Sequence, residues 1–492
     1  MRILSRISRL VTVLTVVFVA GCGGGSVSTT AVPSTAVPTT PVTATPATTT
    51  SSTFSIGGSV TGLSSGMSVT LLDNGSDSST VSANSAFTFP TQLASGASYS
   101  VTVGNNPAGQ TCAVTNGSGT VSTANVTNVA VACTAVTESV LYSFGTSNSD
   151  GHFPYGGLIM DGAGNLYGTT VNGGTNGAGA VFKITAAGTE SILYSFGTGN
   201  GDGQNPYASL VMDGSGNLYG TTYNGGTNGV GTVFKITPTG AESVLHAFGA
   251  IPDGQNPYAG LIMDSSGNLY GTTYNGGTNS VGTVFKITAA GAESVLHAFG
   301  PGPDGQNPYG GLILDGSGNL YGTTSSGGTN NVGAAFKITP TGTESVLHSF
   351  GTGSDGQNPY AGLILDGSGN LYGTTYSGGT NHTGTVFKIT PTGSESVLYA
   401  FGTSPDGQNP YASLILDGAG NLYGTTAIGG TNNKGTVFKI TQTGSESVLY
   451  SFGASPDGQN PNAGLIMDSM GNLYGTTVSG GMYTDGTVFK IN

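Results

Sequence analysis

Tryptophan is absent from this chain of 492 residues, and charged residues make up only 7% of it. An average soluble domain has about 25% charged residues. Glycine is abundant instead, with 87 residues, and the apolar residues fall in short clusters bounded by Gly, Asn, Asp and Pro. Short apolar clusters between turn-forming residues are typical of β-strands. The sequence therefore predicts an all-β protein.

Positive charge is also scarce, because 11 Lys and Arg stand against 24 Asp and Glu, for a formal net charge of −13. Recognition of nucleic acid phosphates needs clustered Lys and Arg. We therefore expect no nucleic acid partner. The acidic balance also disfavours adhesion to anionic lipid head groups.

The N-terminus has an uncharged apolar run, Leu10–Val19, behind three arginines. This run is too short to span a bilayer as a helix, and it suits the hydrophobic region of a signal peptide. The sequence Val19–Cys22 resembles the lipobox of bacterial lipoproteins, which implies that residues 1–21 are removed and that Cys22 carries lipid. Because Gly23 follows rather than aspartate, the resemblance also implies the outer membrane or the cell surface. An ordinary export signal with an unmodified cysteine is the alternative.

Residues 22–53 form the predicted linker. After the cysteine they contain only Gly, Ser, Thr, Ala, Val and Pro, with four prolines spaced through the segment. Such a composition does not bury enough apolar area to fold, and the prolines favour an extended spacer. We therefore interpret this segment as a stalk.

Residues 54–135 alternate apolar and polar residues in several short runs, which predicts a small β-sandwich. Cys112 and Cys133 are the other two cysteines of the chain. In an exported protein we expect them to form one disulfide, and a redox or metal site is less favoured because no histidine accompanies them. The region resembles small bacterial immunoglobulin-like or carboxypeptidase-regulatory-like sandwiches, which implies a spacer domain.

The remaining residues, 136–492, repeat one pattern seven times. The marker Glu-Ser-(Val/Ile)-Leu-(Tyr/His) recurs every 51 or 52 residues, and Phe-Lys-Ile follows the same spacing. Each repeat has four apolar runs that carry bulk on both faces. A sheet with two apolar faces must pack between neighbours, as blades do around a propeller axis.

The ends of this region predict a closed ring. It opens with a lone strand, Glu138–Phe144, and stops at residue 492 after the third strand of the last repeat. The first strand can complete the last blade as its outer strand, which leaves no open sheet edge. Small residue pairs such as Ala208–Ser209 precede each first strand and suit a crowded axis. The sequence thus predicts a seven-bladed β-propeller of four-stranded blades, preceded by the small β-sandwich.

The hexapeptide Asn-Leu-Tyr-Gly-Thr-Thr, at Asn217–Thr222 and intact in the other six repeats, resembles the GloVer tandem repeat. This choice-of-anchor family attaches the repeat to varied membrane or surface anchors. The resemblance implies a propeller-like exported protein, and no catalytic residues come with the family.

Candidate catalytic groups have structural interpretations. His246, His297 and His348 occupy a position that is Tyr in the other repeats, which indicates a half-buried ring. If Thr237 pairs with Glu242 across its turn, Lys235 lies diagonally on the same face and forms an ion pair with that glutamate. The sequence lacks the acidic spacing of calcium loops and a Walker loop. We expect no cofactor, no metal and no catalytic site.

Two long connections in each repeat, Asp202–Tyr207 and Tyr223–Asn228 in the second, are expected to emerge on one face of the propeller. Aromatic rings and amides there are suited to carbohydrate, although Asp-Gly and Asn-Pro also form turns whatever they contact. The candidate ligand-binding residues are Asp202, Asn205, Tyr207, Asn224, Asp253, Asn256, Tyr258, Asn275, Asp304, Asn307, Tyr309, Asp355, Asn358, Tyr360, Asp406, Asn409 and Tyr411.

These features predict a lipid-anchored, non-enzymatic surface protein whose propeller presents a repeated polar face to a glycan or a surface protein. Many weak, similar sites would give avidity toward a repetitive ligand. Two alternatives stay open. One is a propeller enzyme, lactonase-like or lyase-like, with a site at one channel end near the divergent first and last repeats, at His152 or Asn462. The other is a purely structural surface spacer.

Overall fold

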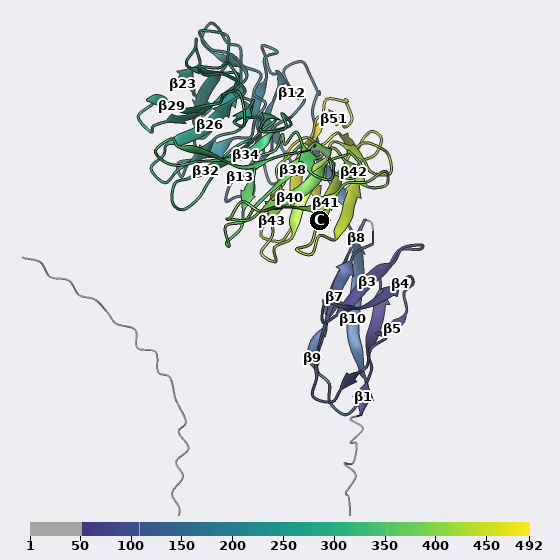
Figure 1. Ribbon diagram of the computed structural model, residues 1–492. Helices are drawn as coiled ribbons and strands as arrows, with labels where there is room; N and C mark the ends of the chain where they lie inside the picture. Colours follow the sequence, from purple (N-terminus) through teal and green to yellow (C-terminus); the bar gives the residue numbers. More distant parts are fainter. Residues whose placement is uncertain (1–51, 108, 352) are drawn as a thin grey trace, which may run out of the picture. The chain divides into compact units, whose positions relative to one another are not determined.

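The computed structural model describes residues 52–107, 109–351 and 353–492. Every regular element in these ranges is a β-strand (Figure 1). Within them, no helix is long and apolar enough to cross a membrane. The prediction of an all-β fold is confirmed. The signal peptide, Cys22 and nearly all of the linker 22–53 lie outside the described residues, so those assignments stay predictions.

The N-terminal part contains two four-stranded sheets and one two-stranded sheet. The first sheet orders β5 (Ala86–Thr88), β2 (Ile56–Thr61), β10 (Val126–Ala135) and β8 (Gln110–Thr115); the second orders β4 (Asp77–Val81), β3 (Val69–Asp73), β7 (Ser98–Asn105) and β9 (Ser118–Thr120); β1 (Thr53–Phe54) pairs with β6 (Leu93–Ala94). Alternate residues of both larger sheets, among them Val60, Leu71 and Val131, share one buried core.

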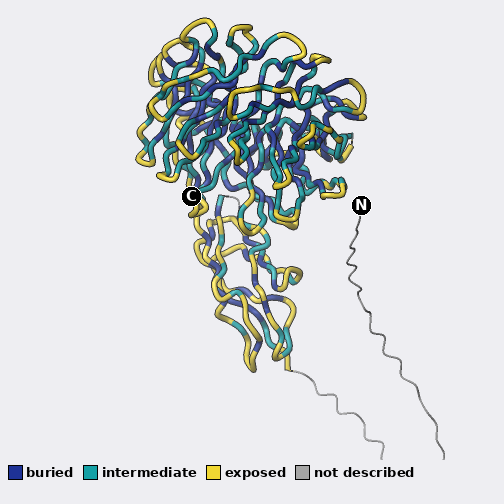
Figure 2. Tube along the Cα trace, turned by 90° about the vertical axis from the view of Figure 1, so that its left-hand side faces the viewer, coloured by how far each residue is buried: buried dark blue, intermediate teal, exposed yellow. Residues whose placement is uncertain are grey.

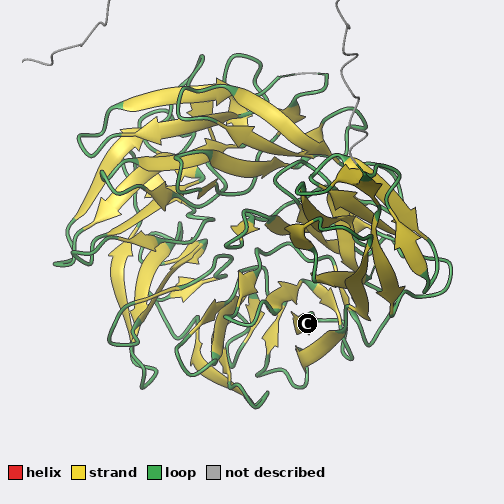
Figure 3. Ribbon diagram, turned by 90° about the horizontal axis from the view of Figure 1, so that it is seen from below, coloured by secondary structure: helices red, strands yellow, loops and turns green. Residues whose placement is uncertain are grey.

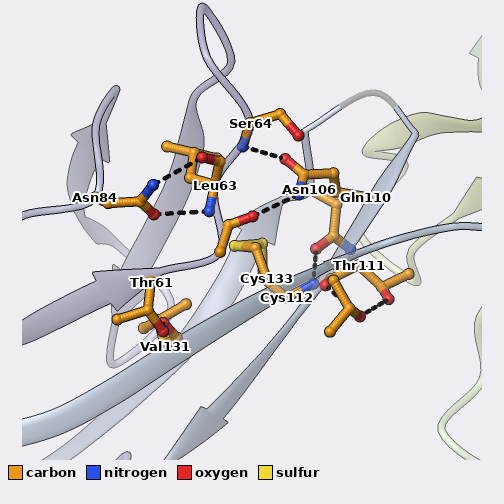
Figure 4. The surroundings of a disulfide bond; sticks show 12 residues. Thr61, Leu63, Ser64, Asn84, Asn106, Gln110, Thr111, Cys112, Val131 and Cys133 are labelled. Atoms are coloured by element: carbon orange, nitrogen blue, oxygen red, sulfur yellow. Dashed lines mark hydrogen bonds between the residues drawn. A yellow bond between two sulfur atoms is a disulfide. The ribbon is translucent and has the colours of Figure 1, made fainter.

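A disulfide joins Cys112 on β8 to Cys133 on β10 (Figure 4). The two cysteines are direct partners in the antiparallel register of these strands. Asn106 Oδ1 accepts a hydrogen bond from the Cys112 N–H at 2.8 Å. A closed loop of this length stabilises a fold by about 3 kcal/mol in the chain-entropy account.

Each repeat forms a four-stranded antiparallel meander, which the second repeat illustrates. Its strands are β19 (Val211–Met212), β20 (Leu218–Thr222), β22 (Thr232–Ile236) and β23 (Glu242–Ala247). Asp213 closes the first turn, because its Oδ1 accepts from the N–H groups of Ser215 and Asn217, each at 2.9 Å. An Asp side chain that accepts hydrogen bonds from nearby backbone N–H groups replaces the bonds those groups would make in a helix. Asp therefore favours turns.

The same meander recurs along the chain. The equivalent sheets are β13 (Ile159–Met160), β14 (Leu166–Thr170), β16 (Ala180–Ile184), β17 (Glu190–Ser195); β25 (Ile262–Met263), β26 (Leu269–Thr273), β28 (Thr283–Ile287), β29 (Glu293–Ala298); β31 (Ile313–Leu314), β32 (Leu320–Thr324), β34 (Ala334–Ile338), β35 (Glu344–Ser349); β37 (Ile364–Leu365), β38 (Leu371–Thr375), β40 (Thr385–Ile389), β41 (Glu395–Ala400); and β43 (Ile415–Leu416), β44 (Leu422–Thr426), β46 (Thr436–Ile440), β47 (Glu446–Ser451).

One further sheet combines strands from both ends of the repeat region. It orders β11 (Glu138–Ser143), β52 (Thr487–Ile491), β50 (Leu473–Thr477) and β49 (Ile466–Met467). β11 pairs antiparallel with β52, with Glu138 opposite Ile491 and Ser143 opposite Thr487. Seen from below, the sheets of this region follow one another around a common centre (Figure 3).

Short two-residue strands pair at the loops of each repeat. They are β12 (Gly151–His152) with β15 (Asn172–Gly173), β18 (Gly203–Gln204) with β21 (Asn224–Gly225), β24 (Gly254–Gln255) with β27 (Asn275–Gly276), β30 (Gly305–Gln306) with β33 (Ser326–Gly327), β36 (Gly356–Gln357) with β39 (Ser377–Gly378), β42 (Gly407–Gln408) with β45 (Ile428–Gly429), and β48 (Gly458–Gln459) with β51 (Ser479–Gly480). This pairing holds the two long connections of a repeat at the same end.

The hydrophobic core lies between consecutive sheets rather than within one. In the repeat region, buried residues lie in the interior and exposed residues are concentrated in the outer loops (Figure 2). In one such cluster, Val181 and Phe196 of one repeat pack with Leu218, Phe234 and Ile236 of the next. The rings of Phe196 and Phe234 meet edge to face, with their centroids 5.0 Å apart. Because each sheet is buried on both faces, it depends on both of its neighbours for stability.

The expected pairing of Thr237 with Glu242 is wrong. Glu242 lies opposite Ile236, and Lys235 lies opposite Ser243, because the turn closes through a bond from Thr237 N–H to the Ala241 carbonyl. Neighbouring residues of a strand point to opposite faces, so this register separates Lys235 from Glu242. The lysine Nζ lies 5.6 Å from the centre of the Tyr219 ring instead. In the described parts of the chain, the ion pairs join His to Asp.

Candidate functional site

The aspartates of the first long connection are used inside the loop. Asp202 is 9% exposed. Its Oδ2 accepts hydrogen bonds from Tyr194 Oη–H at 3.0 Å and from Thr198 N–H at 2.8 Å, while its Oδ1 accepts from Gly203 N–H at 2.7 Å. The carboxylate therefore caps its own loop and does not face solvent as a ligand group.

The exchange of Tyr for His in the outer strand follows from this arrangement. His246 Nε2 lies 3.2 Å from Asp253 Oδ2. It takes the same place beside its aspartate as the Tyr194 hydroxyl takes beside Asp202. Both side chains bring a polar ring atom to the same carboxylate. The other pairs are Tyr142 with Asp150, His297 with Asp304, His348 with Asp355, Tyr399 with Asp406, and Tyr450 with Asp457.

The glutamate that begins the outer strand of the next sheet completes each of these groups. Burial and, to a smaller extent, the charge of Asp202 together raise the pKa of Glu242 to about 7. Glu138 stands in the same relation to Asp457, so strands from the two ends of the repeat region form one such pair. In all seven glutamates, Oε1 is buried and has no hydrogen-bond partner among the described residues. They are Glu138, Glu190, Glu242, Glu293, Glu344, Glu395 and Glu446.

Three of the groups contain a histidine and could in principle hold a cation. His246, Asp253 and Glu293 bring their ligand atoms within 4.8 Å of one another, and the sets with His297 and His348 do the same. Imidazole and carboxylates are common ligands of divalent transition metals. Four other repeats make the same contact to Asp with a tyrosine, however, so a structural hydrogen bond accounts for the arrangement. The expectation of no metal site stays a prediction.

The asparagines of the loops connect one repeat to the preceding one. Asn205 has a positive φ of 56°, and its Nδ2 donates to the Val171 carbonyl at 3.0 Å. Asn224 Nδ2 in turn donates to Asn205 Oδ1 at 3.1 Å. The same bond to the preceding repeat is made by Asn256, Asn307, Asn358 and Asn409, and Asn275 repeats the contact of Asn224. These amides position the loops.

The tyrosines are the loop residues that the structure gathers into one cluster. Successive ring centroids lie between 3.9 and 5.4 Å apart. Near the middle, Tyr411 Oη–H donates to Tyr309 Oη, and burial raises the pKa of Tyr258 to about 12. The ring set, which we call the tyrosine cluster, is Tyr155, Tyr207, Tyr258, Tyr309, Tyr360 and Tyr411.

A second layer of rings packs against the tyrosine cluster. Tyr223 meets Tyr207 and Tyr258 edge to face, at 5.7 and 5.9 Å. Tyr274 and Tyr376 occupy the equivalent place in their repeats. Tyr155 and this second layer were missing from the sequence-based candidates, although an aromatic residue before the Asn/Ser-Gly-Gly connection in three repeats was a usable signal.

The seventh repeat interrupts the tyrosine cluster, because Asn462 replaces the tyrosine. Its Oδ1 is buried and has no hydrogen-bond partner in the part of the chain that the structure describes. A cavity of about 300 Å³ opens beside it. The lining residues are Tyr155, Tyr376, Tyr411, Ala427, Asn460, Asn462, Val478 and Ser479.

Comparison with known proteins identifies the repeat. A family model described as the Gloeobacter/Verrucomicrobia repeat matches residues 97–336 and 310–492. No curated protein matches the chain.

Similar solved structures include the extracellular domain of a protein assigned as a one-component system from B. thetaiotaomicron, with 12% identity, a TM-score of 0.47, and coverage of 71% of this chain and 39% of that chain. A gluconolactonase from Xanthomonas campestris has 14% identity, a TM-score of 0.38, and coverage of 59% and 86%. A protein assigned as a 6-phosphogluconolactonase from Bacteroides uniformis has 17% identity, a TM-score of 0.43, and coverage of 63% and 88%. This chain thus spans well under half of the B. thetaiotaomicron chain. These are similarities of fold, and no activity is transferred from them.

Proposed function

The chain belongs to the Gloeobacter/Verrucomicrobia repeat family, and from that premise we propose that it is a lipid-anchored, non-enzymatic surface protein that binds glycan. Its repeats form a closed seven-bladed propeller in this proposal. The tyrosine cluster is the binding end of that propeller.

Three contacts between the first and last repeats support closure. β11 and β52 share a sheet, and Phe144 and Val488 belong to one core cluster with Leu158 and Phe182. Thr476 Oγ1 also donates to the Gly156 carbonyl at 3.2 Å, as Thr221 does to Ala259 between two consecutive repeats. A ring that joins its ends removes the open sheet edges that invite aggregation.

The tyrosine cluster is the observation that supports glycan binding. It gathers aromatic rings from six repeats at one end of the structure, beside amides and hydroxyls. The described residues that line the two cavities there include no lysine. Aromatic rings present flat apolar faces together with a polar tip, and they suit the C–H face and the hydroxyls of a sugar. The cluster also lies where the long connections of all repeats meet, so one extended ligand can contact several copies.

The N-terminal segments supply the anchor in this proposal. Cys22 carries lipid, the proline-containing linker extends from the membrane, and residues 54–135 are a sandwich that acts as a spacer. Several acyl chains at about 0.8 kcal/mol per buried CH₂ make release from a membrane negligible. A protein held in this way benefits from avidity toward a repetitive polysaccharide.

Retention on immobilised neutral polysaccharides tests the function. The full-length chain is used in a detergent without a sugar head group, because a glycoside detergent would compete for the site. We expect retention of the unmodified protein and a clear loss with Tyr207→Ser. Tyr219→Ser is the matched control, since it removes a half-buried ring that lies beside Lys235 and outside the cluster.

Two results would count against glycan binding. One is that no polysaccharide holds the unmodified chain better than bare resin. The other is that both tyrosine variants lose retention equally, which would indicate a general loss of structure. Retention of a surface protein with no polysaccharide binding would assign the same face to a protein partner.

A further inference from the structure

We propose that the cavity at Asn462 binds one neutral pyranose unit of a glycan, as a single site on each molecule. This inference rests on the proposed glycan-binding function, and it adds the place, the stoichiometry and the charge class of the ligand. The other repeats fill the same place with a tyrosine ring, so they do not repeat the site.

The cavity lies where the seventh ring of the tyrosine cluster is missing. In each of the other six repeats a tyrosine stands at this position and packs against its neighbour in the cluster. Tyr411 precedes the gap and Tyr155 follows it, and both line the cavity. A flat six-membered ring that enters the gap would therefore meet an aromatic side chain on either side.

The second layer is also reduced around this gap. Tyr223, Tyr274 and Tyr376 each pack behind the cluster in their own repeats. The equivalent residues beside Asn462 are the small Ala427 and Val478, which both line the cavity. The missing ring and these two small residues together leave about 300 Å³. That volume is at the lower end of small-molecule sites, about 300–1,000 Å³, and it suits one sugar ring rather than an oligosaccharide.

Asn462 supplies the group that would recognise the ligand. Its Oδ1 is buried without a hydrogen-bond donor among the described residues, and buried acceptors are nearly always satisfied in native proteins. Rotation of the amide about its Cβ–Cγ bond would bring this oxygen to the cavity that Asn462 lines, where a hydroxyl of a bound sugar can donate to it. Ser479 and Asn460 already have partners within the protein, because Ser479 Oγ donates to Asn460 Oδ1 at 2.8 Å and Asn460 Nδ2 donates to the Ala427 carbonyl at 3.0 Å.

The charge of the surroundings selects a neutral ligand. None of the eight described lining residues carries a charge, and the whole chain has a formal net charge of −13. A uronic acid or a phosphorylated sugar would enter without a cationic partner and against that excess of negative charge. A neutral hexose has no such cost.

The test measures binding of methyl pyranosides of glucose, galactose and mannose to the full-length chain by ligand-observed NMR, with glucuronic acid as the charged comparison. We expect at least one neutral pyranoside to bind, at a stoichiometry of one, and glucuronic acid to bind less well. Asn462→Tyr should weaken that binding by about tenfold or more, because it supplies the ring that six repeats already accommodate and so fills the cavity. Met470→Ser is the matched control, since it also restores a residue common to other repeats but lies in an exposed turn away from the cavity.

The outcomes separate this inference from the proposed function. If a polysaccharide retains the unmodified chain and Asn462→Tyr equally, and no pyranoside binding depends on residue 462, glycan binding stands and the pocket assignment is overturned. If a pyranoside binds with the expected dependence on residue 462 while no polysaccharide is retained, the pocket stands and the adhesive function fails. If none of the pyranosides binds the unmodified chain, the inference is overturned.

Discussion

Gly220 shows how closely the core packs around a single residue. It lies in the hexapeptide of β20, where a Cβ atom would stand 2.6 Å from Phe234 Cζ and 2.9 Å from Leu210 Cδ2. Both neighbours belong to the core between two sheets. The equivalent glycine of every repeat faces the equivalent phenylalanine at nearly the same distance, which explains why all seven copies of the hexapeptide have glycine there.

We expect Gly220→Ala to destabilise the repeat region by about 1–3 kcal/mol, because a packed core has no room for an added methyl group. Urea unfolding followed by circular dichroism measures the change. Gly214→Ala is the control, because a Cβ there meets no atom within 4 Å and the turn does not need a positive φ at that residue. Equal unfolding midpoints for the two variants would refute the packing argument.

For single residues, the sequence predicted which residue types recur better than it predicted where each side chain points. The aspartates and asparagines of the long connections were candidates for ligand contact, as turn-forming residues or as sugar ligands. In the structure Asp202 caps its own loop and Asn205 bonds to the preceding repeat. The periodicity of a sequence shows that a residue recurs, but the side-chain direction depends on backbone angles such as the positive φ of Asn205.

Contacts around the strands set the ionisation of the glutamates that begin the outer strands. Each outer strand begins with a glutamate whose carboxyl lies near the aspartate in the first long connection of the same repeat. Burial comes first among the causes that raise the pKa of these glutamates, and the charge of the aspartate comes second; the pKa reaches about 7 for Glu190 and about 8 for Glu446. The folded protein therefore keeps a proton on these groups that the unfolded chain releases near the ordinary pKa of 4.5.

This difference predicts that stability falls as pH rises. Ionising one of these glutamates costs more free energy in the folded protein than in the unfolded chain. This difference does not reduce stability below about pH 4.5, and it reduces stability fully above about pH 7 to 8. We expect the unfolding midpoint to decrease from pH 5 to pH 8. Glu242→Gln, which cannot ionise, should raise the midpoint at pH 8 and change it little at pH 5.

Acid acts through a different set of carboxyls. Hydrogen bonds from Asn217 and other groups of its turn lower the pKa of Asp213 against the opposing effect of burial. Its contribution to stability is present above its ordinary pKa and is lost as pH falls through the folded value.

A midpoint that rises from pH 5 to pH 8, or a Glu242→Gln variant that gains as much at pH 5 as at pH 8, would contradict the buried-glutamate account.

The order of the strands was easier to predict from the sequence than the register in which they pair. Apolar runs and turn residues gave each repeat its meander, since a period of two and an Asp-Gly turn are local signals. The Lys235 to Glu242 pairing failed because it depended on the length of one turn, which the bond from Thr237 to Ala241 sets. A shift of one residue moves a side chain to the other face.

At the scale of the whole molecule, similar repeats produce one site that differs from the rest. The cores lie between sheets, so each repeat is held by its neighbours and local sequence changes are tolerated only where they do not disturb that packing. Asn462 is such a change, because it lies at the end of the structure where the tyrosines meet. The divergence of the last repeat was visible in sequence, whereas the cavity beside it depends on residues from the first, fifth, sixth and seventh repeats.

Closure of the ring is the claim on which the binding end depends, and a disulfide cross-link tests it most directly. Ser139 on β11 and Lys490 on β52 are direct partners in the register, and Cα atoms of such partners lie about 4.5–5.5 Å apart, within reach of a disulfide. We predict that Ser139→Cys with Lys490→Cys forms that bond on mild oxidation, as read by mass spectrometry, while Ser139→Cys with Lys439→Cys, the equivalent lysine of β46, does not. Cross-linking in neither pair, or in both alike, would contradict a propeller closed by its first strand.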